Sequence, residues 1–493
     1  MINNNKKPNI IQIISDTLRT SFLGCYGNKT IKTPNIDKFA KRSNMFTNAY
    51  PESIPTIPAR RAIHTGRRAF PFKSYEPLKW DVVSLPGWQP LSNDEDTIAE
   101  NLVVEGYHTG FVTDTIPYFS PGFNFTRGFL QWEFIRGQEM DRWRSINSVP
   151  GEKLAKYGDP DEILYKGKDI NIIKDIEKQG VPDETLVSIQ QYNLILRHAA
   201  NTMHINSEEE ITTAQVFKWA VDFINDNHDS QPFYLFIDCF DPHEPWEAPY
   251  DYLQIYADKA YKGRTIIFPE YGNVKNRLSQ EEIENIKANY SGLVSLVDKW
   301  FGHFIDELIR LDLWEDSIIV FMSDHGTNFT DNPFGIMGKP SYSMFPGLMN
   351  IPMMIKLPGE KDQGKEFNEL VFNIDATATI YDCLDLENKI LDLDGKSLLP
   401  LVNGNRKYIP RQYVTSRYSN NLWYRDNKHW IIFDLDKKPY AVFDVNKDPF
   451  CSKDIKDSND GKVIEKGWKA LLYDSGGKIP DYRENKETDA VGR

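Results

Sequence analysis

Three short, mostly apolar runs in this sequence are each followed by an acidic residue. The runs span residues 9–14, 233–240 and 317–322, and the acids that follow are Asp16, Asp241 and Asp324. Apolar, β-branched runs of this length predict strands buried on both faces, as in a parallel sheet. The carboxyl ends of parallel strands meet at one edge of a sheet, where the chemistry of such folds gathers. One Asp after a strand is usually a turn former, but three together favour a functional site.

Segments with helical periodicity separate these strands. Helices are predicted over residues 35–42, 97–105, 214–225 and 281–311, and a further strand over residues 108–113. Strands that alternate with helices indicate an α/β fold with a largely parallel sheet. The predicted fold class is therefore α/β, with a large, mostly parallel sheet flanked by helices.

The chain of 493 residues is long enough for two domains. Residues 1–404 are predicted to form the larger α/β domain that carries the acidic residues. Within it, residues 120–207 are rich in aromatic and charged side chains and have no clear period, so we interpret them as an insertion that covers a site or forms a homo-oligomer contact. Short runs at residues 430–434 and 440–445 predict a hairpin. Residues 405–493 are therefore expected to form a smaller domain with an antiparallel sheet.

Composition limits the partners and the compartment. The net charge of −13 argues against binding of a nucleic-acid backbone, whereas a small anionic substrate can still enter a locally positive pocket. The first seven residues are polar, unlike a signal peptide, and no apolar run reaches the ~18 residues that span a bilayer. The four cysteines lie far apart and form no CxxC pair, as in a reducing compartment. The sequence therefore predicts a cytoplasmic protein with no membrane partner.

The segment from Thr56 to Gly66 places a hydroxyl, a proline, an arginine and a closing Thr-Gly where a loop turns into a helix. A helix start presents unpaired backbone N–H groups and the positive end of the helix dipole, which suit an anionic group. Arg60, four residues after Thr56, can add a forked and permanently charged donor. A Thr56 nucleophile could here attack a phosphorus or sulfur centre that carries several oxygens. The alternative is that Thr-x-Pro only caps the helix.

Asp16, Asp324 and His325 offer two carboxylates and one imidazole. This mixture suits Mn²⁺, Zn²⁺ or Fe²⁺, and suits Ca²⁺ less well because Ca²⁺ prefers oxygen ligands only. The same ion would bind the Thr56 hydroxyl and lower its pKa, which a Thr nucleophile needs near neutral pH. The alternative is that Asp324 and His325 only cap a turn. The predicted cofactor is one divalent ion: Mn, Zn, Ca or Fe.

Two residues from other loops complete the predicted site. His243 lies in an Asp-Pro-His-Glu-Pro-Trp loop and is expected to contact the substrate oxyanion or to protonate a leaving group. Lys339 lies in a Met-Gly-Lys-Pro run and is expected to place a positive charge on the anion, although a lone loop lysine is normally solvated. His64 lies inside the helix that begins at Thr56, where a packing role is favoured over a catalytic one.

Together these motifs resemble the sulfatase family of the alkaline phosphatase superfamily. Residues 56–66 align with the family signature, which is Cys or Ser, any residue, Pro, Ser or Ala, and Arg, followed by Thr-Gly. The other segments that carry the resemblance are residues 8–27, 33–37, 240–243, 323–326, 338–339 and 440–449. They occur in the family's order and span most of the chain, with residues 120–207 the least covered.

The resemblance implies an alkaline phosphatase-like fold, one divalent metal, a covalent enzyme intermediate and hydrolysis of a sulfate, phosphate or phosphonate ester. The substrate it implies is a small anionic ester. The metal ligands that it implies by position are Asp16, Thr56, Asp324 and His325. The catalytic residues that it implies are Thr56 as nucleophile, Arg60 as its support, and His243 and Lys339 on the anion or leaving group.

Two positions depart from the typical sulfatase pattern. Sulfatases carry a Cys or Ser that is oxidised to formylglycine, whose hydrated form has two hydroxyls that let the sulfated intermediate collapse. Thr56 has one hydroxyl and is not a target of that modification, so no formylglycine is expected. Water attack readily releases a phosphorylated Thr, whereas attack at the sulfur of a sulfated Thr is hard. Asp16-Thr17 stands where many sulfatases have two acids, which with Asp324-His325 resembles the phosphonate monoester hydrolase and phosphodiesterase branch.

The leading hypothesis is a metal-dependent hydrolase of phosphate or phosphonate mono- or diesters that acts through a covalent Thr56 intermediate. The alternative is a sulfuric ester hydrolase with an unmodified Thr. A further alternative is a catalytically silent binding protein, against which the retention of all the predicted site residues argues.

Overall fold

The structure is a computed structural model that describes residues 7–76, 83–168, 183–230, 232–360, 363–386, 390, 392–405, 408–458, 461–483 and 488–489. Most of the polar start of the chain and residues 169–182 of the predicted insertion lie outside these ranges. No helix within the described ranges is both long and apolar enough to cross a membrane. The four cysteines have free thiols.

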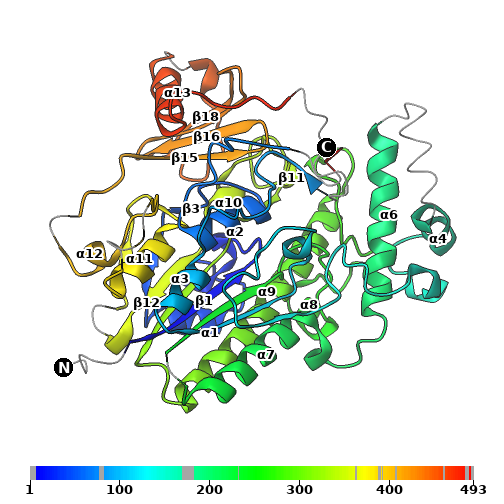
Figure 1. Cartoon of the computed structure of the whole chain (residues 1–493). Helices are drawn as coiled ribbons and strands as arrows, with labels where there is room; N and C mark the ends of the chain where they lie inside the picture. Colours follow the sequence, from blue (N-terminus) through cyan, green and yellow to red (C-terminus); the bar gives the residue numbers. More distant parts are fainter. Residues whose placement is uncertain are drawn as a thin grey trace.

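An eight-stranded sheet forms the centre of the fold (Figure 1). Its order is β13 (Glu366–Phe367), β2 (Asn44–Phe46), β12 (Met353–Lys356), β9 (Ser317–Met322), β1 (Asn9–Ser15), β7 (Phe233–Cys239), β5 (His108–Thr113) and β6 (Gln131–Phe134). The strands from β9 to β6 pair in parallel, whereas β12 is antiparallel to both β9 and β2. The predicted large, mostly parallel sheet is confirmed.

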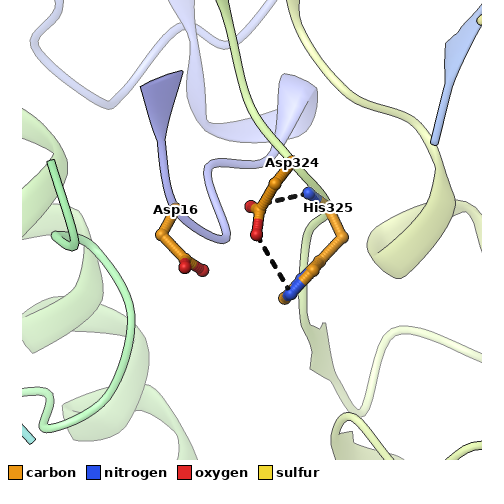
Figure 2. A group of neighbouring side chains, drawn as sticks. All are labelled: Asp16, Asp324 and His325. Atoms are coloured by element: carbon orange, nitrogen blue, oxygen red, sulfur yellow. Dashed lines mark hydrogen bonds and ion pairs between the residues drawn. The ribbon is translucent and has the colours of Figure 1, made fainter. Parts of the chain in front are cut away.

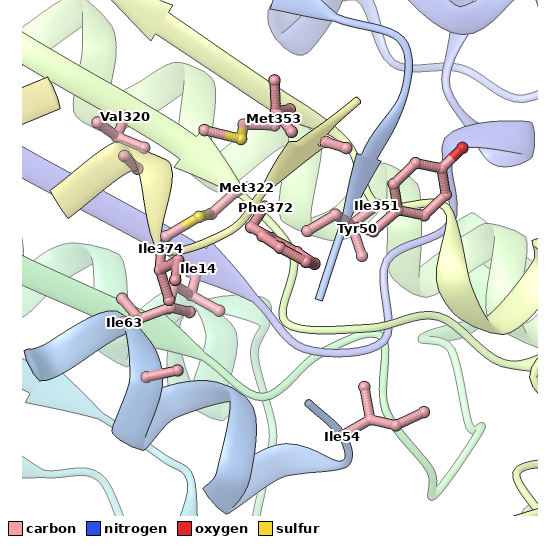
Figure 3. Packing of buried hydrophobic residues seen from close by; sticks show 14 of the residues in the cluster. Ile14, Tyr50, Ile54, Ile63, Val320, Met322, Ile351, Met353, Phe372 and Ile374 are labelled. Carbon is pink, nitrogen blue, oxygen red and sulfur yellow. The ribbon is translucent and has the colours of Figure 1, made fainter. Parts of the chain in front are cut away.

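Helices cover both faces of this sheet, and β1 shows why. Ile11 and Ile13 pack into a buried cluster with residues of α1 (Pro34–Ala40), α7 (Thr212–Asn227) and α9 (Gln280–Arg310). The alternate residues Ile10 and Ile14 pack into the opposite cluster, because successive side chains of a strand point to opposite faces. That second cluster includes residues of α2 (Thr56–Thr65), α3 (Ile98–Val104), α10 (Pro346–Met349) and α11 (Asp375–Cys383), and Figure 3 shows part of it.

The helices and strands predicted from periodicity are all present, with ends within two residues of the predicted ones. Local signals fix several of these ends. Both α3 and α9 begin with a capping box, in which a Thr or Ser side chain and the Glu three residues later bond each other's backbone N–H.

The segment of residues 120–207 divides between the central fold and an outer layer. Phe125 and Phe129 are buried in the core, and β6 extends the main sheet at its edge. Farther along, α4 (Pro160–Lys168) and α6 (Asp183–Thr202) pack against each other away from that sheet (Figure 1). Helix α8 (Tyr250–Tyr256) packs on α9 nearby. The division into domains stays a prediction.

A four-stranded antiparallel sheet follows near the C-terminus, in the order β15 (Tyr413–Tyr418), β16 (Asn421–Asp426), β17 (His429–Phe433) and β18 (Pro439–Asp444). The predicted hairpin is β17–β18. One face of this sheet is covered by α13 (Lys462–Asp474). The other face joins the main core, where Trp423 and Trp430 lie with ring centroids 5.1 and 6.0 Å from that of Tyr50.

The C-terminal sheet and α13 also contact the segments on either side of α2. Ile54 forms a β-bridge with Tyr418 of β15. Arg68 donates to the Thr415 carbonyl at 2.8 Å and to the Asp474 carboxylate at 2.9 Å. The start of α2 is therefore positioned by residues far along the chain.

Candidate active site

Asp16, Asp324 and His325 meet at the carboxyl edge of the main sheet. Asp16 follows β1 and Asp324 follows β9, and the pairing of these neighbouring strands places their ends side by side. One possible ligand atom from each of the three residues lies within 4.8 Å of the others, and all three side chains are fully buried (Figure 2). The structure thus brings Asp16 next to Asp324 and His325, which lie more than three hundred positions later in the sequence.

His325 has its ring oriented by one hydrogen bond. Its Nδ1 lies 2.9 Å from the carbonyl oxygen of Gly326, and because a carbonyl can only accept, Nδ1 carries the proton. Burial lowers the pKa of His325, so the ring is neutral and Nε2 carries a lone pair. This Nε2 is buried without a hydrogen-bond partner among the described residues. A neutral ring held in this way is the form in which histidine binds metals.

The Asp324 carboxylate is oriented by backbone donors. One of its oxygens accepts the N–H groups of Thr17 at 3.1 Å and His325 at 2.7 Å. Burial opposes ionisation, but the charge of Arg60 and these two N–H groups favour the carboxylate, and the pKa of Asp324 is lowered. The carboxylate is therefore ionised and fixed in place.

Arg60 is fully buried and contacts three carboxylates. Its Nε and Nη2 donate to the two oxygens of Asp238 at 2.7 and 2.8 Å. Nη2 also lies 2.9 Å from an Asp16 oxygen, and Nη1 donates to Asp324. Nη1 lies 3.4 Å from the backbone carbonyl oxygen of Thr56 as well. The guanidinium group of Arg60 thus faces the three carboxylates. A catalytic role of Arg60 stays a prediction.

The charges of this cluster fit a divalent cation. With all three carboxylates ionised, these groups and one guanidinium carry a formal charge of −2 in a fully buried place. Burial and the charge of Asp324 raise the pKa of Asp16, so without a cation this carboxyl resists ionisation. Buried charge without compensation is strongly unfavourable. Apart from the ion pair with Arg60, the Asp16 oxygens have no polar partner among the described residues, so they and His325 Nε2 are available as ligands. The site is therefore a candidate divalent metal centre.

Asp238 is a site residue that the sequence analysis missed. It lies inside the apolar strand β7 and also accepts the Tyr118 hydroxyl at 2.5 Å and the Thr115 hydroxyl at 3.3 Å. The available signal was an acid within an otherwise apolar run, next to the strand's carboxyl end. Because Asp238 binds both Nε and Nη2 of Arg60, it fixes the plane of the guanidinium.

His64 lies in the packing position that was predicted for it. Its ring is fully buried, 4.5 Å from the Phe236 ring and 5.5 Å from the Phe125 ring between centroids. Burial, helped by the charge of Arg60, lowers the pKa of His64 to about 3. The ring is therefore neutral and takes part in the core.

His243 and Lys339 meet at Glu244, in the loop after β7. The His243 ring stacks on Phe240 with centroids 4.2 Å apart, and its Nδ1 donates to the Glu244 carbonyl at 2.7 Å. Lys339 donates to the Glu244 carboxylate, which also accepts the Tyr271 hydroxyl at 2.9 Å. Burial and the charge of Lys339 lower the pKa of His243 to about 3, so Nε2 carries no proton near neutral pH.

Thr56 is the first residue of α2, where the sequence predicted a helix start. Its side chain is almost completely buried, with 5% exposed. Arg60 links this residue to the acidic cluster through the carbonyl contact described above. The assignment of Thr56 as nucleophile and metal ligand stays a prediction.

Comparison with known proteins agrees with this geometry. The sulfatase family profile matches residues 8–386, and the profile of the N-sulphoglucosamine sulphohydrolase C-terminal region matches residues 341–473. An arylsulfatase of Clostridium perfringens is 27% identical over 473 residues, which cover 87% of this chain and 88% of the relative. Iduronate 2-sulfatase of Mus musculus is 25% identical over 379 residues, covering 71% of this chain and 59% of the relative.

The fold has a close match among solved structures. The phosphonate monoester hydrolase of Agrobacterium radiobacter superposes with a TM-score of 0.68 and 18% identity, and the match covers 97% of each chain. The family profile covers most of this chain and includes the edge of the sheet where the buried cluster lies. The chain therefore belongs to the sulfatase family of ester hydrolases.

Proposed function

We propose that this protein hydrolyses phosphate or phosphonate mono- or diesters through a covalent Thr56 intermediate. The observation that carries the proposal is the threonine at the first position of α2, one turn before Arg60, whose guanidinium contacts the Thr56 backbone carbonyl and the three buried carboxylates. A threonine ester of phosphorus can be released by water, whereas a sulfated threonine needs difficult attack at sulfur. The similarity in fold to phosphonate monoester hydrolase is consistent with this choice.

The proposed reaction has two displacements at phosphorus. In the first displacement the Thr56 hydroxyl gives up its proton and its oxygen forms a bond to phosphorus as the bond to the ester oxygen breaks; the leaving oxygen takes up a proton and departs as an alcohol, so no net proton is needed. In the second, water forms a bond to phosphorus and gives up a proton, and the Thr56 oxygen leaves and takes up a proton, which restores the hydroxyl. A divalent ion bound by Asp16, Asp324 and His325 would supply Lewis acidity and lower the pKa of the Thr56 hydroxyl.

The surrounding residues fit an anionic group at this place. The start of α2 offers backbone N–H groups that have no partner within the helix, together with the positive end of its dipole. His243 does not add to this fit: its Nδ1 proton lies on the Glu244 carbonyl, and its Nε2 carries no proton near neutral pH, so the ring can accept a hydrogen bond but cannot donate one to an anionic oxygen. Lys339 forms an ion pair with the Glu244 carboxylate, which partly compensates its positive charge.

The sulfuric ester alternative remains the second candidate, because the relatives named above are an arylsulfatase and an iduronate 2-sulfatase. The test is to assay the purified protein with 4-nitrophenyl esters of a phosphodiester, a phosphonate and a sulfate, each with added Mn²⁺ or Zn²⁺. We expect the phosphorus esters to turn over with a higher kcat/KM than the sulfate. Turnover of the sulfate alone would select the second candidate, and no turnover of any ester would favour the silent binding protein.

Asp324→Asn is expected to weaken metal binding as well as catalysis, because it removes one negative charge from the proposed ligand set. The affinity for Mn²⁺ should fall at least 10- to 100-fold, since the loss of even an outer-sphere partner of a metal ligand costs about that much. Isothermal titration calorimetry measures the affinity. Asp306→Asn, on the exposed surface of α9, is the matched control. Full Mn²⁺ affinity in Asp324→Asn would refute the ligand assignment.

A further inference from the structure

Tyr118 contacts both members of the buried ion pair between Arg60 and Asp238. It lies in the short 3₁₀ helix η3 (Ile116–Phe119), which follows β5, and only 2% of its surface is exposed. Its hydroxyl donates to Oδ2 of Asp238 at 2.5 Å, and the centre of its ring lies 5.6 Å from the guanidinium carbon of Arg60. Burial and the charge of Asp238 raise the pKa of the Tyr118 hydroxyl, so it keeps its proton and acts as a donor. No step of the proposed reaction uses this residue.

The topology of the main sheet brings Tyr118 to this place. The strands β5 and β7 are parallel neighbours, and Thr113 at the end of β5 pairs with Asp238 near the end of β7. The chain that leaves β5 therefore reaches the Asp238 side chain within a few residues. Thr115 donates its hydroxyl to Oδ1 of Asp238 at 3.3 Å, and Tyr118 donates to Oδ2. The pairing of two strands thus brings two hydroxyls to one carboxylate.

These contacts divide the three carboxylates of the cluster into two kinds. An ionised carboxylate offers about four lone-pair sites, and two N–H groups of Arg60 together with the two hydroxyls occupy those of Asp238. Asp238 therefore has no site left for a cation. The Asp16 oxygens, in contrast, have no polar partner among the described residues apart from Arg60. The two hydroxyls thus make Asp238 the anchor of Arg60 and leave the ion to the other carboxylates.

We propose that Tyr118 is a positioning residue of the metal centre. Its hydroxyl fixes the Asp238 carboxylate, and the guanidinium of Arg60 lies over its ring. Held in this way, Arg60 keeps Nη2 on Asp16 and Nη1 on Asp324. These two carboxylates thereby keep the orientation in which their oxygens converge with the neighbouring imidazole. The inference rests on the proposed function, of which the metal centre is a part.

The test is Tyr118→Phe, which removes only the hydroxyl and keeps the ring in the core. We expect the affinity for Mn²⁺ to fall about tenfold, at the lower end of the loss for outer-sphere partners of metal ligands, because Tyr118 acts through two further residues. Isothermal titration calorimetry with Mn²⁺ alone measures this affinity without any ester turnover. At saturating Mn²⁺ the kcat of the variant should return close to that of the wild type, because the refilled site has all its ligands.

Tyr381→Phe is the matched control for a merely structural role. Tyr381 is fully buried in the same hydrophobic cluster as Tyr118, and its hydroxyl accepts a hydrogen bond from Asn101 at 2.9 Å. Both variants therefore lose a buried, hydrogen-bonded hydroxyl, and urea denaturation should show similar losses in the free energy of unfolding. Only Tyr118→Phe should weaken the binding of Mn²⁺.

A double-mutant cycle shows whether Tyr118 acts through Arg60. In an Arg60→Met background the hydroxyl has no guanidinium to position, so adding Tyr118→Phe should leave the Mn²⁺ affinity unchanged. Additive losses in the cycle, or equal Mn²⁺ affinities of Tyr118→Phe and Tyr381→Phe, would overturn the role of Tyr118 and leave the proposed function intact. A wild type that binds neither Mn²⁺ nor Zn²⁺ would overturn the metal centre and this role together. If Arg60→Met does not fold, the comparison of Tyr118→Phe with Tyr381→Phe decides.

Discussion

Thr56→Ala is expected to lower kcat/KM by about three to six orders of magnitude, as removal of the nucleophile does in other enzymes that form covalent intermediates. Thr56 begins α2 and its side chain is almost completely buried, so alanine fits the space and the helix start is kept. The fold and the affinity for Mn²⁺ should therefore change far less than the rate. Steady-state kinetics on the best ester from the substrate panel, circular dichroism and isothermal titration calorimetry with Mn²⁺ measure the rate, the fold and the metal affinity.

Thr56→Ser is the matched control because it keeps the hydroxyl and removes only a methyl group. We expect it to retain measurable turnover. Mass spectrometry of acid-quenched wild-type protein should show a phosphoryl or phosphonyl group on the peptide that contains Thr56, and Thr56→Ala should lack it. Wild-type rates in Thr56→Ala would remove this residue from the mechanism.

Arg60→Met is expected to destabilise the fold by about 3–5 kcal/mol, the usual cost of removing one partner from a buried ion pair. The guanidinium contacts Asp16, Asp238 and Asp324, all of them fully buried. Methionine has a similar length but no charge, so the three carboxylates would be left together without compensation. Urea denaturation followed by circular dichroism measures the free energy of unfolding.

The neighbouring Arg61 provides the control. It pairs with Glu95 at 2.8 Å in a partly exposed position, and such pairs contribute only about 0–1 kcal/mol. Arg61→Met should therefore be nearly neutral. Mn²⁺ should restore part of the stability of Arg60→Met, because a cation that binds only the folded state stabilises it. If Arg60→Met and Arg61→Met unfold at the same urea concentration, Arg60 does not compensate the cluster.

The sequence predicted the frame of the site because the signals are local. Asp16 and Asp324 each come two residues after a short, mostly apolar run that predicts a buried strand, and parallel strands bring their ends together. Arg60 was recognised by its spacing from Thr56 within the helix. The direction of the Arg60 side chain could not be predicted, because it depends on Asp238, which comes from the distant strand β7.

The remaining residues were missed because their roles depend on long-range contacts. Asp238 looks like an interruption of an apolar strand until Arg60 lies against it. In the sequence analysis Glu244 was only part of the loop that carries His243. In the structure its carboxylate pairs with Lys339 and so reduces the positive charge that this lysine can place on an anion.

The contact between the C-terminal sheet and the segment ahead of α2 has a consequence for the order in which the protein matures. Ile54, two residues before Thr56, pairs with Tyr418, and Arg68, just after α2, pairs with Asp474. A ribosome makes the first member of each pair several hundred residues before the second. The segments on either side of α2 therefore acquire their final neighbours only at the end of translation, so the nascent chain should be inactive until then.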